Sequence, residues 1–335
     1  MKASRLYSLA LGLAFILASG YAMAQQQVVS KASPQMEAVK VATKQMIDQG
    51  FGAKFDGSTD PFHLRQIIEM AQEYLAMEPN VEITPVMMGG IEGELHTPQG
   101  ARDDAILIYI HGGGMICGNA KASRGYASAL AGESKFPVYT LTYRLAPEHQ
   151  FPAGLDDCFG FYKAVISKHP GKPIFLLGES AGAYYTLATT MKARDNGVKL
   201  PAAIFPYSPL IDLSGALNRK RAATHDFTIS EEGMKWMGNL YCQPEDQKNP
   251  YASPYYDDLH GMPPTFLAWD QSETLAADSE EVVKKLLEQG IECYFKAYPD
   301  CFHAFALAGR GTPESYEVMR NTINFIEAHI NKLNI

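Results

Sequence analysis

A candidate nucleophile stands near the middle of the chain, in the segment Gly178-Glu-Ser-Ala-Gly182. The segment fits the pattern G-x-S-x-G. It follows an apolar run, residues 174–177, that predicts a buried strand, and a predicted helix at 183–192 comes after it. A strand, a tight glycine turn and a helix form a nucleophile elbow, which lifts the Ser180 hydroxyl clear of the sheet edge. Such a turn is strained and crowded, so a side chain at position 178 or 182 would collide with the neighbouring strand or helix. The alternative is a glycine-rich turn with an idle serine.

A second glycine-rich segment, His111-Gly-Gly-Gly114, follows the apolar run 105–110. Glycines at a strand end let backbone N–H groups point into a cleft without obstruction by side chains. We therefore predict that the N–H groups of Gly113, Gly114 and Ala181 form an oxyanion hole. The alternatives are a flexible loop or a loop that holds a phosphate. The dinucleotide pattern G-x-G-x-x-G is not met, which argues against a nucleotide cofactor.

A nucleophilic serine needs a base, and the base needs an acid that orients it. His303 follows a predicted strand near the C-terminus, and the chain order serine, acid, histidine makes it the favoured base. Three carboxylates compete for the role of the acid. Asp270 falls at a strand end, Glu273 lies three residues into the next loop, and Asp278 better suits the cap of the following helix. Spacing alone favours Glu273 only modestly.

The elements that position these residues alternate between strand and helix from residue 105 to the end. This alternation predicts an α/β fold with a mostly parallel central sheet that is flanked by helices on both faces. A hairpin precedes it, because Gly89-Gly90 separates two strand-like runs. The strands are expected at 81–88, 91–97, 105–110, 138–143, 174–177, 202–206, 265–269 and 293–298, and the helices at 152–167, 183–192, 278–289 and 314–330.

Two regions exceed what this alternation needs. Two helices, which start at Ser33-Pro34 and Asp60-Pro61, precede the first strand, and a long segment separates the strands at 202 and 265. We expect both regions to form a helical cap over the sheet edge at which open α/β sheets bind ligands. The predicted organisation is therefore N-terminal helices contributing to the cap at 25–80, a core in two parts at 81–210 and 263–335, and a cap insertion at 211–262.

Composition and the first residues indicate an exported globular protein. The 335 residues are 46% hydrophobic and 20% charged, enough for one large domain. A formal net charge of −8 argues against nucleic acid as a partner. Residues 1–24 are typical of a signal peptide, with Lys2 and Arg5 in its positive region and Ala22-Met23-Ala24 as its cleavage site. We expect cleavage after Ala24 and a periplasmic or secreted protein. No stable membrane anchor is expected, because the apolar run is too short to span a bilayer.

The five cysteines are expected to be free thiols. Their number is odd and their spacing is scattered, which argues against a disulfide framework. No histidine or cysteine cluster indicates a metal site, and no cofactor is expected. The edge strand at 293–298 is one candidate contact for a homodimer. The cysteines are Cys117, Cys158, Cys242, Cys293 and Cys301.

Taken together, these segments resemble the bacterial hormone-sensitive-lipase-like esterases (family IV) of the α/β-hydrolase superfamily. The resemblance runs from about residue 81 to the end and implies an α/β-hydrolase fold whose helical cap comes from the same two regions. Besides the two glycine-rich segments, it rests on Tyr143-Arg-Leu-Ala-Pro-Glu-His-Gln-Phe-Pro152, residues 249–254, residues 259–264 and His303-Ala-Phe305.

The resemblance also implies which carboxylate is the acid. Family members carry Asp-Pro-Leu at the acid, and counting from Pro264 this position falls on Glu273-Thr274-Leu275. Glutamate for aspartate and threonine for proline are departures, so Asp270 stays open. Another departure is Glu179, which we expect to affect packing more than activity. For residues 143–152 we expect a structural role, with Arg144 and Glu148 as an ion pair.

We expect a serine carboxylesterase that hydrolyses small-molecule esters of short to medium acyl chains through an acyl-enzyme on Ser180. Glu273 and His303 would complete its triad. One alternative is an amidase or peptidase with the same triad. The other is a non-catalytic ligand-binding protein on a hydrolase fold. The presence of all three triad residues and of the glycine loop argues against the latter.

Overall fold

A sheet of eight strands forms the centre of the protein in the part that the computed structural model describes, residues 31–72, 76–219 and 226–333. The strand order is β1-β2-β4-β3-β5-β6-β7-β8. The hairpin β1–β2 and the pair β2–β4 are antiparallel, and all other neighbours are parallel. The predicted mostly parallel sheet is confirmed. Its strands are β1 (Val81–Met88), β2 (Ile91–Pro98), β3 (Ile106–Ile110), β4 (Val138–Leu141), β5 (Ile174–Glu179), β6 (Ala203–Tyr207), β7 (Thr265–Asp270) and β8 (Cys293–Tyr298).

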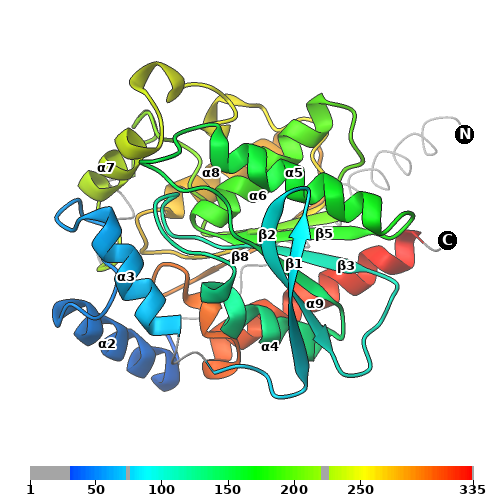
Figure 1. The fold of residues 1–335 in the computed structure, drawn as a ribbon. Helices are drawn as coiled ribbons and strands as arrows, with labels where there is room; N and C mark the ends of the chain where they lie inside the picture. The colour runs from blue at the N-terminus through cyan, green and yellow to red at the C-terminus, as the bar shows by residue number, and fades with distance from the viewer. Residues whose placement is uncertain (1–30, 73–75, 220–225, 334–335) are drawn as a thin grey trace, which may run out of the picture.

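Helices cover both faces of the sheet (Figure 1). Helices α5, α6 and α8 lie on one face, and α4 and α9 lie on the other. Helices α2 and α3 lie to one side, and α7 lies beyond α3. The described helices are α2 (Pro34–Asp48), α3 (Pro61–Gln72), α4 (Arg124–Ser134), α5 (Ala153–Lys168), α6 (Ala181–Asp195), α7 (Glu231–Tyr241), α8 (Ala276–Glu288) and α9 (Pro313–Leu333).

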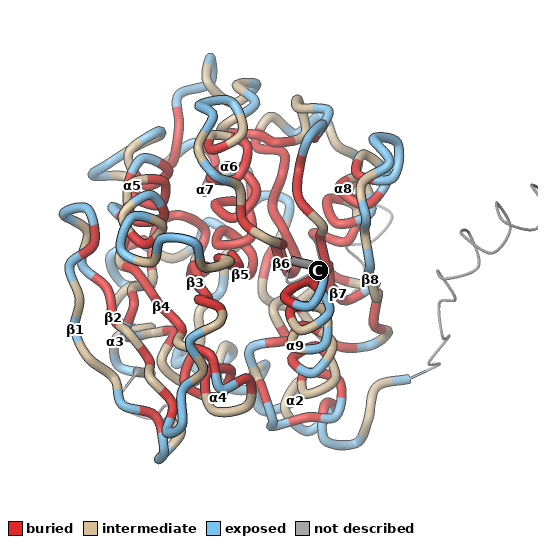
Figure 2. The backbone as a smooth tube through the Cα atoms, turned by 90° about the vertical axis from the view of Figure 1, so that its right-hand side faces the viewer, coloured by how far each residue is buried: buried red, intermediate tan, exposed pale blue. Residues whose placement is uncertain are grey.

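The central strands are buried on both faces, which explains their continuous apolar sequence. In β3, Ile106, Ile108 and Ile110 pack into the core on the side of α5 and α6, whereas Leu107 and Tyr109 pack toward α4 and α9. This division follows the two-residue period of a strand. Figure 2 shows buried residues concentrated in these strands, and exposed or half-buried ones along β1 and β8 at the sheet edges. The predicted edge position of β8 is thus confirmed, and the homodimer contact there stays a prediction.

The long segment between β6 and β7, residues 208–264, contains α7, and we call it the insertion. It packs against the N-terminal region, because Phe55 and Ile229 form a short parallel bridge. It also contacts α6, where the Tyr184 hydroxyl lies 2.8 Å from that of Tyr241 and donates to the carbonyl oxygen of Tyr251 at 2.9 Å. The domain boundaries of the cap stay a prediction. The predicted signal peptide lies outside the described residues.

One helix was missed and two predictions about local structure were wrong. Helix α4 was not foreseen, because its buried side chains include small ones such as Ala127 and Ala131, which give a weak apolar pattern. Helix α8 begins at Ala276 after the cap residue Leu275, so Asp278 lies in its first turn and is not its cap.

The third error concerns the segment 143–152. Arg144 does not pair with Glu148. Instead its guanidinium contacts Asp157 at 2.8 Å, while Glu148 accepts two hydrogen bonds from Arg65 at 2.5 and 2.7 Å. Spacing in sequence could not indicate these partners, because α3 and α5 supply them.

The cysteines and the helix lengths bear on two further predictions. The five cysteines are free, as predicted, and four of them are buried. Among the described residues, no helix combines the length and the apolar character that a membrane crossing requires.

Candidate functional site

Ser180 occupies a sharp turn between β5 and α6. Its φ of 56° and ψ of −122° lie in a region that L-residues rarely adopt. The turn fits only because glycines flank it: a Cβ on Gly178 would overlap the carbonyl oxygen of Gly182, and one on Gly182 would overlap that of Ile110. The predicted steric need for both glycines is confirmed. The Ser180 N–H donates to the carbonyl oxygen of Tyr207 at 2.9 Å, which fastens the turn to β6.

The glycine loop after β3 is held by its carbonyl oxygens. The oxygen of Gly112 accepts from the Tyr143 hydroxyl at 3.3 Å, and the oxygen of Gly113 accepts from the N–H and thiol of Cys117 at 3.0 and 3.1 Å. Because a trans peptide directs its N–H opposite to its C=O, the N–H groups of Gly113 and Gly114 point away from these anchors. Within the described part of the chain, neither N–H donates to an acceptor.

The first N–H of α6 is a third available donor. Ala181 opens this helix, and the first N–H groups of a helix have no acceptor within it. The positive end of the helix dipole favours negative charge at the same place. The three predicted donors therefore sit on two segments next to Ser180. An oxyanion hole requires donors of this kind, with no competing partner.

Glu179 joins the glycine loop to the serine turn. Its carboxylate accepts from the N–H of Gly112 at 2.6 Å and from the hydroxyl of Tyr109. Burial raises the pKa of Glu179 to about 7, although both hydrogen bonds oppose the rise. The sequence predicts that Glu179 affects packing more than activity, whereas the structure shows that its carboxylate connects the glycine loop to the serine turn. The sequence places Glu179 beside Ser180 but does not reveal its contact with Gly112.

His303 contacts Glu273. The imidazole Nδ1 lies 3.2 Å from Oε2 of Glu273, and the same oxygen accepts from the hydroxyl of Ser208 at 3.0 Å. Glu273 is 1% exposed and His303 is 7% exposed. The other ring nitrogen, Nε2, has no hydrogen-bond partner within the described residues. Glu273 therefore fixes one side of the ring, and the nitrogen on the other side has no partner that would prevent it from accepting a proton. Sequence reasoning missed Ser208, which immediately follows β6.

Charges around the histidine favour its protonated form. Burial by itself lowers the pKa of His303, but the carboxylates of Glu273, Asp226 and Glu179 outweigh burial, and the pKa is raised above its ordinary value. Burial raises the pKa of Glu273, and the imidazolium of His303 opposes that rise.

The two other candidate acids have different partners. Asp270 accepts from the N–H of Cys301 at 3.0 Å and from the hydroxyl of Ser272 at 2.6 Å, so it fastens the loop after β7 to the loop after β8. Asp278 is fully buried and pairs with Arg219 at 2.6 and 2.8 Å. Among the three carboxylates, Glu273 is the one in contact with His303.

The insertion covers the glycine loop. A Cβ on Gly114 would overlap Sδ of Met237 in α7, so this sulfur lies directly over the glycine. Met237 is buried, and Ser180 is only 8% exposed. The insertion therefore covers part of the loop that carries two of the predicted oxyanion donors.

Metal-binding geometry occurs in one group of the described residues, Asp257, Asp258 and His260. Its ligand atoms already have partners. Asp257 accepts from Arg194 at 2.9 and 3.1 Å, and Asp258 lies 2.6 Å from the His260 ring. Asp258 and His260 are also exposed. The geometry does not point to a metal role, and the absence of a cofactor stays a prediction.

Comparisons with known proteins show the family of this chain and what it is similar to. Residues 107–307 match the family described as alpha/beta hydrolase fold. An esterase of Acinetobacter venetianus is 28% identical, with 79% of this chain and 88% of the relative covered. An acetyl-hydrolase of Streptomyces hygroscopicus is 30% identical, with 82% and 90% covered. The crystal structure of an esterase from the bacterial hormone-sensitive lipase family superposes with a TM-score of 0.81 at 27% identity, covering 89% of this chain and 99% of that one.

Proposed function

Because this chain belongs to the α/β-hydrolase fold family and is an esterase of the hormone-sensitive lipase type, we propose that it hydrolyses esters of short to medium acyl chains through an acyl-enzyme on Ser180. The observation that carries the proposal is the contact of His303 Nδ1 with Glu273 Oε2, which leaves Nε2 open. The strained turn at Ser180 supports it, since it holds the hydroxyl in one orientation.

The first half of the reaction acylates Ser180. The hydroxyl proton passes to Nε2 of His303 as Oγ bonds to the ester carbonyl carbon. Glu273 holds the ring and stabilises the imidazolium. The N–H groups of Gly113, Gly114 and Ala181 bind the oxyanion. The intermediate then breaks its bond to the alcohol oxygen, which takes the proton from His303.

The second half releases the acid. His303 removes a proton from water as the water oxygen bonds to the acyl carbon. A second oxyanion forms against the same N–H groups. Its collapse breaks the bond to Oγ, and Ser180 regains a proton from His303. No step in this sequence needs a redox partner or a further group.

Two features support a short acyl group. The Streptomyces hygroscopicus relative is named an acetyl-hydrolase. In this chain Met237 lies over Gly114, which leaves little room beside the oxyanion donors unless the side chain moves. Amide hydrolysis by the same residues is the second candidate, and rates on matched ester and amide substrates separate the two.

The test is turnover of p-nitrophenyl esters of increasing acyl length by the wild type, Ser180→Ala and Ser58→Ala. Ser58 serves as the matched control, because it lies in the N-terminal region and its hydroxyl donates a hydrogen bond to Asp56. Ser180→Ala should lose at least about a thousandfold in kcat, whereas Ser58→Ala should keep wild-type turnover. A fluorophosphonate adduct located on Ser180 by mass spectrometry would identify the nucleophile directly. Unchanged turnover in folded Ser180→Ala would refute the proposal.

We also propose export with removal of residues 1–24, which the positive, apolar and small-residue segments of that stretch support. The check is the N-terminal sequence of the mature protein made in a bacterial host. A first residue at Gln25 is the expected result. Retention of Met1 in the cytoplasm would oppose it.

A further inference from the structure

Two loops meet a part of the insertion near the catalytic pair. The first loop follows β7 and carries Glu273, and the second follows β8 and carries His303. Facing them are residues 226–230 of the insertion, which we call the latch segment. Phe227 of this segment packs against Phe302, with ring centroids 5.8 Å apart. The latch segment therefore touches the residue next to the histidine.

Asp226 and Thr274 connect the latch segment to the acid loop. One carboxylate oxygen of Asp226 accepts from the backbone N–H of Thr274 at 2.8 Å. In the opposite direction, the Thr274 hydroxyl donates to the carbonyl oxygen of Ile229 at 2.8 Å. Thr274 is 1% exposed and directly follows Glu273. Two buried or half-buried hydrogen bonds thus attach the latch segment one residue from the acid.

Asp226 also shapes the latch segment itself. Its other carboxylate oxygen accepts from the N–H groups of Thr228 and Ile229 at 2.9 and 3.0 Å and from the Thr228 hydroxyl at 2.6 Å. One side chain therefore fixes the local turn and the attachment to the acid loop together. Buried hydrogen bonds to a charged group are stronger than those between neutral groups.

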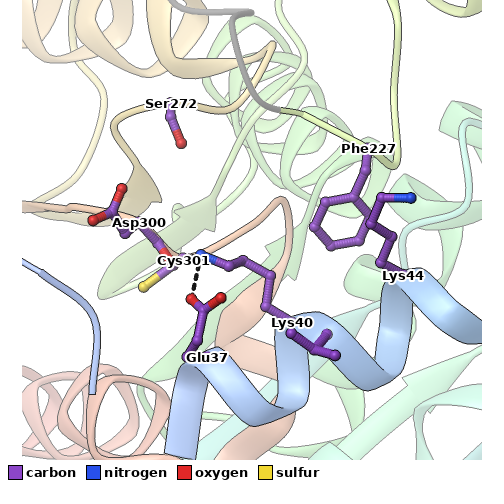
Figure 3. Close-up of a pocket in the computed structure, with 8 residues that line it drawn as sticks. Glu37, Lys40, Lys44, Phe227, Ser272, Asp300 and Cys301 are labelled. Atoms are coloured by element: carbon purple, nitrogen blue, oxygen red, sulfur yellow. Dashed lines mark hydrogen bonds and ion pairs between the residues drawn. The ribbon is translucent and has the colours of Figure 1, made fainter. Parts of the chain in front are cut away.

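Packing on the outer side of this junction is incomplete. A hollow of about 400 Å³ lies between α2 and the two loops, and Phe227, Ser272 and Cys301 contribute to its lining (Figure 3). Figure 3 shows Lys40 and Lys44 of α2 across the hollow from Ser272. Because a hollow adjoins Phe227, packing on that side of the latch segment is loose, and the hydrogen bonds of Asp226 and Thr274 hold the segment together with the buried side chain of Ile229.

The latch segment leads directly into α7, which carries Met237 over Gly114. The insertion thus touches the acid loop at its latch segment and the glycine loop at α7. A displacement of the insertion would act on both.

We propose that Asp226 and Thr274 are positioning residues that couple the insertion to the acid of the triad, so that Glu273 is held against His303 while the insertion is seated. This inference rests on the proposed function. Neither residue contacts the reacting atoms. Their effect passes through the backbone between Glu273 and Thr274.

The charge of Asp226 offers a second readout. The charged groups that act on His303 are Glu273 on the loop after β7, Asp226 on the insertion and Glu179 on β5. Each raises the pKa of the imidazole against the effect of burial. Removing the Asp226 charge should therefore lower the pKa of His303, and the acid side of the rate profile should move to lower pH.

The experiment compares Asp226→Asn, Thr274→Val and Thr274→Ser with Asp56→Asn. Asp56 is the matched control, because it accepts from the N–H and hydroxyl of Ser58 in the same kind of turn and, among the described residues, has no hydrogen bond with Thr274. Thr274→Val removes the hydroxyl donor but changes no charge, and Thr274→Ser restores the donor. The readouts are kcat and KM for a p-nitrophenyl ester, and the His303 titration followed by NMR of protein labelled with ¹⁵N-histidine.

The expected result is a loss of about tenfold in kcat for Asp226→Asn and Thr274→Val, with KM changed less than about twofold. Thr274→Ser should recover most of kcat. The His303 titration should move to lower pH in Asp226→Asn and stay in place in Asp56→Asn. Thr274→Val with wild-type kcat, or Asp226→Asn that behaves as Asp56→Asn in both readouts, would overturn the proposal.

The titration separates this inference from the proposed function, because it needs no substrate. A wild type that hydrolyses no ester, but whose His303 titration responds to Asp226→Asn and not to Asp56→Asn, would refute the esterase proposal and support the coupling. If the wild type is active, but kcat and the His303 titration are unchanged in Asp226→Asn and Thr274→Val, the result would support the esterase proposal and refute the coupling.

Discussion

Glu179 accepts a hydrogen bond from the N–H of Gly112 at 2.6 Å, and this bond joins the serine turn to the glycine loop. Two segments that lie far apart in sequence, and that supply all three proposed oxyanion donors, are thereby held in register. The acceptor is a buried carboxyl whose pKa burial raises to about 7. The stability that this hydrogen-bonded carboxyl confers should therefore depend on pH, and this dependence can be measured.

The first prediction concerns how the free energy of unfolding depends on pH in the wild type and in Glu179→Gln. A carboxyl whose pKa rises on folding binds its proton more tightly in the folded state. Its contribution to stability is therefore full below the ordinary pKa of 4.5 and is lost as pH rises through about 7. Relative to the wild type, Glu179→Gln should gain about 3 kcal/mol in free energy of unfolding between pH 4 and pH 8.

Urea unfolding at several pH values measures this difference. Tyr109→Phe is the control, because it removes a partner of Glu179 but keeps the carboxyl, and its pH dependence should retain the wild-type direction. Parallel curves for the wild type and Glu179→Gln would show that Glu179 does not titrate in this range.

The second prediction separates the two candidate acids. Glu273→Gln keeps the shape of the side chain but removes the charge that orients and stabilises the imidazolium, so kcat should fall by about 10⁴. Asp270→Asn keeps an acceptor for the N–H of Cys301 and should lose less than about tenfold. Steady-state rates on one p-nitrophenyl ester measure both. The reverse order of losses would assign the acid to Asp270.

The sequence predicted the frame of the site well, because local signals carry it. The apolar runs of β3 and β5 need helices on both faces, and the glycines at 178 and 182 are required by contacts that any such turn makes. Three carboxylates remained in competition, since spacing along the chain does not show which loop folds toward His303. The contact between Oε2 of Glu273 and Nδ1 of His303 arises only when the two loops fold against each other.

Partners supplied by distant segments were beyond the sequence. Arg144 has Glu148 four residues away, yet it pairs with Asp157 because α5 begins against the segment that carries it. Ser208 and Asp226 reach the acid loop from the insertion and its margin, and no pattern marks either residue. Such contacts depend on how a long insertion returns to the sheet.

The third prediction tests crowding at the serine turn. Gly182→Ala would place a Cβ on the carbonyl oxygen of Ile110, so β3 and α6 would have to separate. We expect a loss of at least about 3 kcal/mol in the free energy of unfolding, or no folded protein. Gly160→Ala is the matched control, because this glycine lies in α5 with no atom near the added Cβ. It should gain about 0.5–1 kcal/mol.

Thermal and urea unfolding measure both glycine variants. A folded Gly182→Ala with wild-type stability would mean that β3 and α6 are not in the close contact described. Loss of stability in Gly160→Ala would show that alanine is unfavourable in this helix for another reason, and the comparison would then need a different reference position.

The fourth prediction concerns the ion pair that anchors the insertion to the core. Arg219 contacts Asp278 at 2.6 and 2.8 Å and donates to the carbonyl oxygen of Asp212 at 2.7 Å, and both charged side chains are buried. Arg219→Met would leave Asp278 buried and charged, with the N–H of Ile211 as its remaining described donor. The free energy of unfolding should fall by about 3–5 kcal/mol.

Lys44→Met provides the comparison, because Lys44 pairs with Asp48 at 2.6 Å on the surface, where both side chains are more than half exposed. Its loss should be below about 1 kcal/mol. Asp278→Asn added to Arg219→Met removes the uncompensated charge and should recover part of the stability. If Arg219→Met were as mild as Lys44→Met, the pair could not be what holds the insertion to α8. If the double variant recovers stability, the fall in the free energy of unfolding of Arg219→Met comes from the unpaired charge of Asp278. Packing around position 219 cannot explain the recovery, because it is the same in both proteins.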